Sequence, residues 1–257
     1  MTIYLYIARI FMGFAIAAIQ TNLGSATEIK VLSTHAALEV LSELGPKFEE
    51  ATGYTLSFSY DPANAITRQI ENGAPFDVVI ITRKAVDDLV RQGKILPDSC
   101  VDIGRSGLGV SVRKGAPKPD ISTVESFKQT MLGTKSVIRS TEGTSGLYFE
   151  TLLNRLGIAD EMKGKIKLGP SGRVAEFVAR GEVEIAVQQV SELLPVIGAD
   201  FVGPFPSELQ LFTIFSAGVS MASREPKVSK AFIDFLTAPT SASVIRAKGL
   251  EPISTNK

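Results

Sequence analysis

The amino-acid sequence predicts an α/β fold in which helices cover both faces of parallel sheets. Strand-like and helix-like stretches alternate along the chain from residue 28 onward. The run Phe76–Ile81 (FDVVII) is continuously apolar, which is typical of a strand buried on both faces. Leu38, Leu41, Leu44 and Phe48 recur at helical spacing, as on the core-facing side of an amphipathic helix.

The first half of the chain gives clear local signals in order. Residues 28–33 form a short apolar strand, and the helix expected at 36–53 ends at Gly53. Pro46 lies inside that helix, so it should kink the helix or begin a second one. Polar and apolar residues alternate over 55–60, which favours a half-buried strand. The next predicted elements are a helix at 63–73, the strand at 76–81 and a helix at 83–94.

The second half continues the alternation. A capping-box pattern, Ser122 and Glu125, marks the start of a helix at 122–132. The remaining strands are expected at residues 107–112, 135–140, 165–169, 183–189 and 211–222. The remaining helices are expected at residues 145–157, 172–182 and 191–198, followed by two helical segments that close the chain. We find no internal repeat or low-complexity segment.

Residues 1–26 differ from the rest of the chain and are predicted to be a signal peptide. After Arg9 come about ten apolar residues, Ile10–Ile19, and then the small residues Gly24–Ala26. The apolar stretch is too short to span a bilayer, which takes about 20 residues. We therefore expect an exported, periplasmic protein without stable membrane insertion once the signal is cleaved. An uncleaved signal that acts as an anchor is the alternative.

Charge and cysteine content exclude several classes of function. Lys plus Arg and Asp plus Glu number 27 each, and no basic run offers a surface for nucleic acid. The single cysteine, Cys100, and the single histidine, His35, provide neither a disulfide nor a zinc site. Fingerprints for phosphate loops and dinucleotides are absent. We expect a monomer with no metal and no cofactor.

Polar residues gather where predicted strands end and helices begin. In sheets of this kind, ligands bind beyond the carboxyl ends of the strands, where helix N-termini present free N–H groups. We therefore predict that five polar turns converge on one cleft; their placement indicates where a ligand could lie and not which ligand it is. The predicted ligand-binding residues are Ser33, Thr34, His35, Tyr60, Asn64, Arg139, Thr144, Ser145, Ser171, Arg173, Gln188 and Gln189.

Two residues are candidate proton carriers if the cleft performs chemistry. His35 has a suitable pKa range, although a residue that merely opens a helix would look the same in sequence. Glu142 is the second candidate base, although a carboxylate in the first turn of a helix is also favoured by the helix dipole. Arg173 could clamp a carboxylate or be an ordinary solvated side chain. Arg68 is expected to form a structural ion pair.

The stretch Arg68–Ile80 (RQIENGAPFDVVI) resembles a motif of the molybdate-binding-like periplasmic solute-binding proteins of ABC importers. LVRQGK at 89–94, TSGLY at 144–148, FVARGEVEIAV at 177–187 and the closing segment at 231–252 resemble the same family. This resemblance implies a two-lobed type II periplasmic-binding-protein fold with hinge strands and an interlobe cleft. It implies lobe 1 at residues 27–108 and 215–257, and lobe 2 at residues 109–214.

The resemblance extends to the fold, but the residues that bind molybdate in the family are only partly present in this chain. Where molybdate binders place two serine hydroxyls, this chain has Ala36 and Ala63, and Gln189 corresponds to their tyrosine ligand. Ser33, Thr34 and Asn64 could provide substitute donors. An organic carboxylate is therefore a better expected ligand than molybdate.

A narrower resemblance keeps an enzymatic function open. The segments 107–123, 187–195 and 201–210 are similar to a subgroup that includes the periplasmic aconitate isomerase. The leading hypothesis is ligand capture for an ABC importer, with the permease as partner. The alternative is a cofactor-free isomerase that shifts an allylic proton of aconitate, with His35 or Glu142 as base. A weaker third hypothesis is a binding subunit that signals to a membrane sensor.

Overall fold

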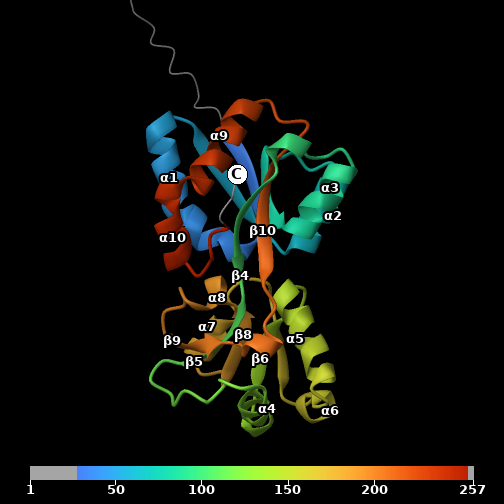
Figure 1. Ribbon diagram of the computed structural model, residues 1–257, viewed down its shortest axis with the longest axis vertical. Coiled ribbons are helices and arrows are strands. Elements are labelled where there is room, and N and C mark those ends of the chain that lie inside the picture. Colours follow the sequence, from blue (N-terminus) through green and yellow to red (C-terminus); the bar gives the residue numbers. More distant parts are fainter. Residues whose placement is uncertain (1–27, 254–257) are drawn as a thin grey trace, which may run out of the picture.

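A computed structural model describes residues 28–253, so the predicted signal peptide at 1–26 lies outside the described residues. The chain folds into two α/β lobes, one above the other in Figure 1. Each lobe contains one five-stranded sheet, with strand order β2-β1-β3-β10-β4 in lobe 1 and β7-β6-β8-β5-β9 in lobe 2. The predicted two-lobed α/β class is confirmed. Within residues 28–253, no helix combines the length and apolar character needed to cross a bilayer.

Lobe 1 holds both ends of the described chain. Its strands are β1 (Glu28–Ser33), β2 (Thr55–Tyr60), β3 (Val78–Thr82), β4 (Val101–Ser106) and β10 (Thr213–Val219). Its helices are α1 (Leu38–Thr52), α2 (Ala63–Glu71), α3 (Arg83–Arg91), α9 (Pro226–Thr237) and α10 (Ala242–Ala247), with the 3-10 turns η1 (His35–Ala37), η2 (Pro97–Ser99) and η4 (Pro239–Ser241). β1 pairs in parallel with β2 and β3, whereas β10 runs antiparallel to β3 and β4.

Lobe 2 repeats this plan. Its strands are β5 (Leu108–Arg113), β6 (Val137–Ser140), β7 (Ile166–Gly169), β8 (Ile185–Gln189) and β9 (Ala199–Pro204). Its helices are α4 (Val124–Gly133), α5 (Thr144–Arg155), α6 (Ala159–Met162), α7 (Ala175–Ala179) and α8 (Val190–Leu193), with the 3-10 turn η3 (Ser207–Leu209). β6 is parallel to β7 and β8, and β5 is antiparallel to β8 and β9.

Both sheets are buried on both faces, which explains the continuous apolar strands. On β3, Val78 and Ile80 pack on the side of α1 and α9, whereas Val79 and Ile81 pack on the side of α2 and α3. Each fully buried side chain of this size stabilises the fold by about 1.5–3 kcal/mol. The turns at the facing edges of the lobes therefore follow strands that are packed into a hydrophobic core.

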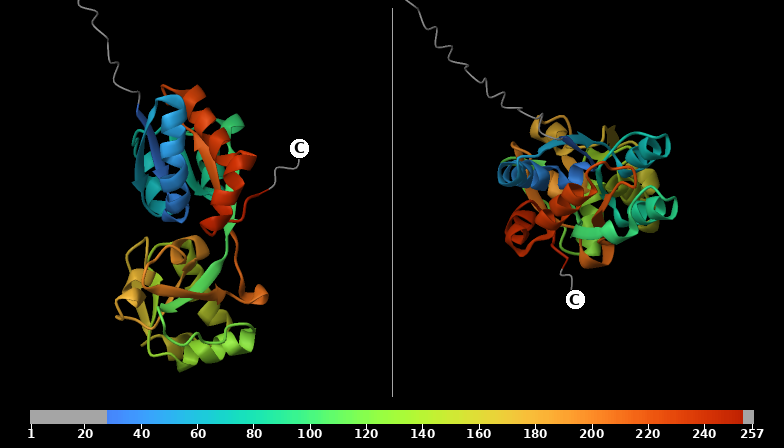
Figure 2. Two further views of the ribbon diagram at one scale, coloured as in Figure 1. Left: turned by 90° about the vertical axis from the view of Figure 1, so that its left-hand side faces the viewer. Right: turned by 90° about the horizontal axis from the view of Figure 1, so that it is seen from above.

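The lobes are joined by two segments of chain, visible at the waist of the molecule in Figure 2. The first passes from β4, which ends at Ser106, into β5, which begins at Leu108. The second returns from β9 to β10 through residues 205–212. The two segments are fastened together because the carboxamide of Gln210 bonds both backbone groups of Leu108, at 2.6 and 2.9 Å. The predicted lobe boundaries, 108/109 and 214/215, stay predictions.

Several local expectations need correction. A second helix does not begin at Pro46, because α1 continues through it with the proline on the exposed face. The carbonyl that loses its partner there can be hydrated. The capping box of α4 is Thr123 and Ser126, one residue later than predicted. The last long strand spans Thr213–Val219 rather than 211–222, because the preceding residues belong to the segment between the lobes.

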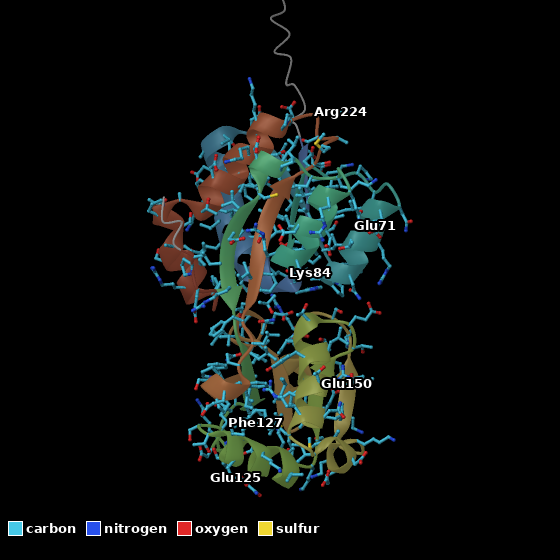
Figure 3. All side chains as sticks on the ribbon, turned by 45° about the vertical axis from the view of Figure 1, so that its right-hand side comes forward. Glu71, Lys84, Glu125, Phe127, Glu150 and Arg224 are labelled. Atoms are coloured by element: carbon cyan, nitrogen blue, oxygen red, sulfur yellow. The ribbon has the colours of Figure 1, made fainter. Side chains whose placement is uncertain are left out.

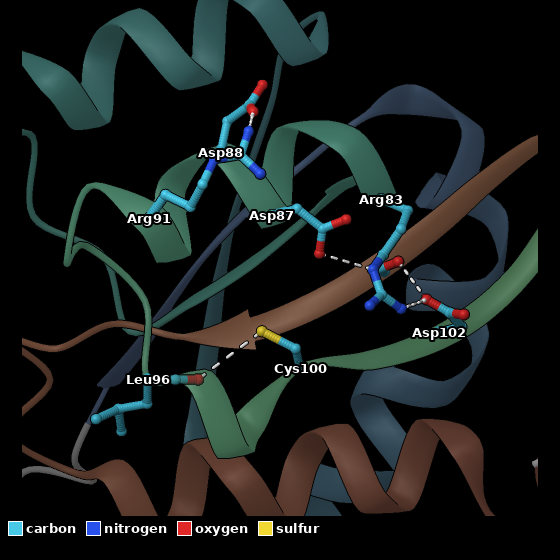
Figure 4. A network of polar contacts seen from close by, with 8 residues as sticks. Arg83, Asp87, Asp88, Arg91, Leu96, Cys100 and Asp102 are labelled. Atoms are coloured by element: carbon cyan, nitrogen blue, oxygen red, sulfur yellow. Dashed lines mark hydrogen bonds and ion pairs between the residues drawn. The ribbon is translucent and has the colours of Figure 1, made fainter.

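The strands next to the crossings are anchored to α3. Arg83 donates to Asp102 on β4 at 3.0 Å, and Ser216 on β10 donates to the same carboxylate at 2.6 Å (Figure 4). Cys100 lies beside this network with its thiol 3.8 Å from the carbonyl of Leu96. Burial raises the pKa of the Cys100 thiol. Cys100 is therefore a packing residue rather than a nucleophile.

Candidate functional site

A small cavity of about 40 Å³ lies between the lobes. Its walls are the turns that follow β1, β2, β3, β6, β7 and β8, so segments far apart in sequence meet there. The lining residues from lobe 1 are Thr34, His35, Ala36, Asp61, Pro62, Ala63, Thr82 and Phe215. The lining residues from lobe 2 are Ser140, Gly143, Thr144, Ser145, Ser171, Gly172, Gln188, Gln189 and Glu192.

The end of β1 forms one wall. Thr34 extends the strand pairing by donating its N–H to the carbonyl of Ile80, at 3.0 Å. Its hydroxyl is buried and has no hydrogen-bond partner among residues 28–253, which is rare for a buried polar atom. Ser33 is directed elsewhere, because its hydroxyl donates to the carbonyl of Thr34 at 3.1 Å. Thr34 therefore offers a free hydroxyl to the cavity and Ser33 does not.

His35 begins η1 and lines the same wall. Burial lowers the pKa of its imidazole, with Asp61 acting to raise it and Arg173 to lower it. The ring lies 5.9 Å from the ring of Tyr60. His35 is therefore a neutral imidazole at pH 7 that can donate or accept one hydrogen bond toward the cavity.

The turn after β2 places fewer predicted ligand-binding residues in the cavity than we expected from the sequence. Asp61 lines the cavity, but one carboxylate oxygen accepts a hydrogen bond from Gln69 at 2.8 Å. Tyr60 packs against the hydrophobic core of lobe 1, and burial raises its pKa to about 12. Asn64 is exposed, and its side-chain oxygen accepts from the N–H of Ala65 at 2.8 Å. Tyr60 and Asn64 are absent from the cavity lining.

In lobe 2 the opposite wall is the end of β6 and the first turn of α5. The Ser140 hydroxyl is buried and has no partner among the described residues. Glycines allow this tight arrangement, since a Cβ atom at Gly146 would lie 2.1 Å from the Ser140 carbonyl oxygen, and one at Gly143 would lie 2.4 Å from the Ser140 hydroxyl. Thr144 and Ser145 follow at the N-terminus of α5, which has no side-chain cap. Both also line the cavity.

The turn after β7 completes this wall. Gln188 holds the turn by donating to the carbonyl of Gly172 and accepting from the N–H of Val174 at 3.2 Å. Gly172 has a φ of 106°, and a Cβ there would come within 3.3 Å of the His35 ring. Ser171 lines the cavity beside it. This glycine lets lobe 2 approach the imidazole of lobe 1 closely.

Gln189 lines the cavity and also connects the two crossings. Its carboxamide accepts from the Thr213 hydroxyl at 3.0 Å, and its nitrogen donates to the carbonyls of Ser106 at 3.0 Å and Gly107 at 3.2 Å. Both segments of chain between the lobes are thus held by one side chain. Gln189 therefore connects the cavity to both segments of chain between the lobes.

Three predicted charged residues lie outside the cavity lining. Arg173 forms an ion pair with Glu39 of α1, which ties lobe 2 to lobe 1. Glu142 is paired with Arg68 at 3.7 Å, a second contact between the lobes, so Arg68 has the structural ion pair that was expected. Arg139 is buried in lobe 2 and donates to Glu150 of α5, which Figure 3 labels in the lower lobe.

Glu192 is a titratable residue of the cavity that sequence reasoning missed. It lies on α8, directly after the buried strand β8, and keeps some exposed surface. Burial raises its pKa to about 8, and hydrogen bonds from the Gln189 backbone and the Gln188 side chain act in the opposite direction. Glu192 is therefore protonated at pH 7. The available signal was a glutamate three residues past the end of a buried strand.

The side chains that line the cavity provide uncharged hydrogen-bond donors, and two of the lining residues, Asp61 and Glu192, are acids. Within residues 28–253, no lysine or arginine lines it. Hydroxyls of Thr34 and Ser140, the imidazole of His35 and the start of α5 can all donate hydrogen bonds to an anion. In the described part of the chain, no three His, Cys, Asp or Glu side chains gather as metal ligands would.

Comparison with known proteins agrees with the two-lobed fold. The family model of the bacterial extracellular solute-binding proteins matches residues 29–251. The chain is 35% identical over 233 residues to aconitate isomerase of a Pseudomonas species, covering 88% of each chain. It is 24% identical to the molybdate-binding protein ModA of Escherichia coli, covering 93% of each. The structure of the Azotobacter vinelandii periplasmic molybdate-binding protein matches with a TM-score of 0.75 and 21% identity, over 88% of this chain and all of that one. The predicted family resemblance is confirmed.

Proposed function

Because the chain belongs to the bacterial extracellular solute-binding proteins, we propose that it captures a small organic carboxylate between its lobes for an ABC importer. The predicted signal peptide supports a periplasmic location for this capture. An ABC permease would be the partner that receives the ligand. Opening and closing of the two lobes about the paired crossings would admit and seal it.

The observation that carries the proposal is a pair of unpartnered hydroxyls on residues that line the cavity from opposite lobes. Thr34 belongs to lobe 1 and Ser140 to lobe 2, and both hydroxyls are buried. Leaving a buried hydroxyl unpaired costs about 1–3 kcal/mol, so a ligand that accepts from both recovers this energy only when the lobes are closed. An oxygen-rich anion fits that requirement.

A carboxylate is favoured over molybdate by the side chains at two wall positions. Ala36 and Ala63 line the cavity where the family resemblance leads us to expect serine donors for molybdate. Methyl groups cannot donate to an oxyanion, and they leave apolar wall against which carbon atoms can pack. A ligand with both a carbon skeleton and carboxylate oxygens uses both kinds of surface.

The test is a thermal-shift and calorimetric panel of molybdate, sulfate, citrate, malate, and cis- and trans-aconitate. A ligand that binds only the folded state raises Tm by mass action, and we expect at least one carboxylate to do so. Thr34→Val and Ser140→Ala should each reduce the shift, because each removes one donor to the ligand. Stabilisation by molybdate or sulfate alone, or by no anion, would refute the proposal.

A second candidate function is the isomerisation of aconitate, which the 35% identical Pseudomonas relative favours. In this reaction a base removes a proton from the methylene carbon, and the double-bond electrons shift by one carbon. The same proton, or one from a second acid, is then added to the former vinylic carbon. The reaction consumes nothing, and hydrogen-bond donors would stabilise the charge that develops on the carboxylate.

His35 and Glu192 are the groups whose position in the cavity suits this proton transfer. Neutral His35 can accept a proton, and protonated Glu192 can supply one. Glu142 does not line the cavity and is paired with Arg68, so its position does not support the role of base that the sequence suggested for it. Incubation of purified protein with trans-aconitate, followed by proton NMR, should show cis-aconitate. His35→Gln should abolish its formation, and no product at stoichiometric protein would exclude this activity.

A further inference from the structure

We propose that Glu192 holds a proton that it donates to the bound anion, so that ligand capture and proton binding are coupled. This inference rests on the proposed capture of a carboxylate. Glu192 lines the cavity from lobe 2, and with His35 and Asp61 it is one of three titratable side chains among the lining residues. It would be a binding residue that sets the pH range in which the cleft can close on its ligand.

The lining of the cavity favours a proton on Glu192 when an anion is bound. A cavity of about 40 Å³ holds little more than one water molecule, so the lobes would have to part to admit a carboxylate ligand, whose oxygens would then lie against the walls. Two ionised carboxylates in such contact repel each other, whereas a shared proton makes the pair a strong hydrogen bond. No cation among the lining residues of the described chain can offset the repulsion. Asp61, the other acid, already accepts a hydrogen bond from Gln69.

The surroundings of Glu192 favour the protonated form before any ligand arrives. Burial raises its pKa, and the opposing hydrogen bonds come from the Gln189 backbone and the uncharged Gln188 side chain. α8 packs against η1, β5, β8 and β9. The titratable or charged residues on these elements are His35 on η1, Arg113 at the far end of β5 and Asp200 on β9.

The end of α10 also approaches α8, because Gly249 lies close to Ser191. Lys248 on that segment is paired with Glu43 of α1, and Arg246 lines a separate groove on the hinge side. None of these charged side chains acts on the pKa of Glu192. Burial is thus the main cause that favours the protonated form of Glu192.

The experiment measures trans-aconitate and citrate binding by calorimetry from pH 6.5 to 9.5. Above neutral pH the carboxyl groups of both probes stay ionised, so a change in affinity reports on the protein. The wild-type affinity should be level near pH 7 and then fall by about tenfold per pH unit once Glu192 ionises. At pH 9, buffers of different ionisation enthalpy should reveal uptake of close to one proton per ligand bound.

Two variants distinguish the contribution of Glu192 to the pH dependence of binding from that of the other acid in the cavity. Glu192→Gln keeps a donor of the same shape but cannot ionise, so its affinity should stay level to pH 9.5. Asp61→Asn is the matched control, an acid of the same cavity whose loss should leave the fall with pH in place. Level wild-type affinity, or the same fall in Glu192→Gln, would overturn the coupling while leaving carboxylate capture intact. Absence of binding by both probes at every pH would overturn both.

Discussion

The raised pKa of Glu192 predicts that Glu192→Gln stabilises the ligand-free protein, increasingly so as pH rises. In the unfolded chain the carboxyl ionises near its ordinary pKa of 4.5, whereas in the folded protein it does so near 8. Between these values only the unfolded state releases the proton. Rising pH therefore favours unfolding of the wild type, and glutamine at this position removes the effect.

The magnitude follows from the two pKa values. Each pH unit above 4.5 costs the folded wild type about 1.4 kcal/mol, so the full cost at pH 7 is about 3 kcal/mol. Water that reaches the cavity screens part of this cost, and we expect Glu192→Gln to raise the free energy of unfolding by about 2–3 kcal/mol at pH 7. The gain should be close to zero at pH 4.5 and largest above pH 8.

Urea unfolding followed by circular dichroism at pH 5, 7 and 8.5 measures these free energies. Glu50→Gln is the control, because Glu50 is exposed on α1 and its loss should change stability little at any pH. A Glu192→Gln variant with the same pH dependence as the wild type would refute the reasoning. So would a constant difference between the two proteins, because that result would indicate a packing effect without a change in proton binding.

Three further predictions follow from the cavity walls and the lobe contacts. Ser140→Ala should weaken carboxylate binding by about 5- to 50-fold, the equivalent of about 1–2 kcal/mol, without loss of stability, as isothermal calorimetry would show. Glu39→Gln removes the partner of Arg173 and should favour the open form, seen as a larger radius of gyration in small-angle scattering of the ligand-free protein; an unchanged radius would contradict this. Gly146→Ala should lower Tm by several degrees, because the new methyl group would meet the Ser140 carbonyl at 2.1 Å, and an unchanged Tm would contradict the tight packing of α5 on β6.

Local sequence signals were sufficient for most of the fold. β3 is buried on both faces, and its continuous apolar residues are readable within a window of five or six positions. The strands that sequence reasoning missed, β4 and β9, lie at sheet edges and mix polar with apolar residues. Their strand character depends on pairing with distant segments, which no local window contains.

The candidate site, too, could be predicted only in part from the sequence. The turns after β1, β6, β7 and β8 could be placed at one edge of their sheets from the order of strands and helices, and Thr34, Ser145 and Gln188 do line one cavity. Side-chain direction within a turn could not be predicted. Ser33 and Thr34 are adjacent and equally polar, yet one hydroxyl bonds the backbone and the other faces the cavity.

The sequence by itself determined the α/β class and the kind of turn that borders the ligand site, because strand periodicity, helix ends and glycines act over a few residues. The division into two lobes was implied by the family resemblance and not by these local signals. Only the tertiary structure decided which charged side chains form ion pairs and which line the cavity. Arg173 and Glu142 find partners on the opposite lobe, more than 70 positions away in the chain, and Glu192 is enclosed by segments from both lobes. Such pairing and burial depend on how the lobes close on each other, and electrostatic energy depends on that closure far more than on the neighbouring residues in sequence.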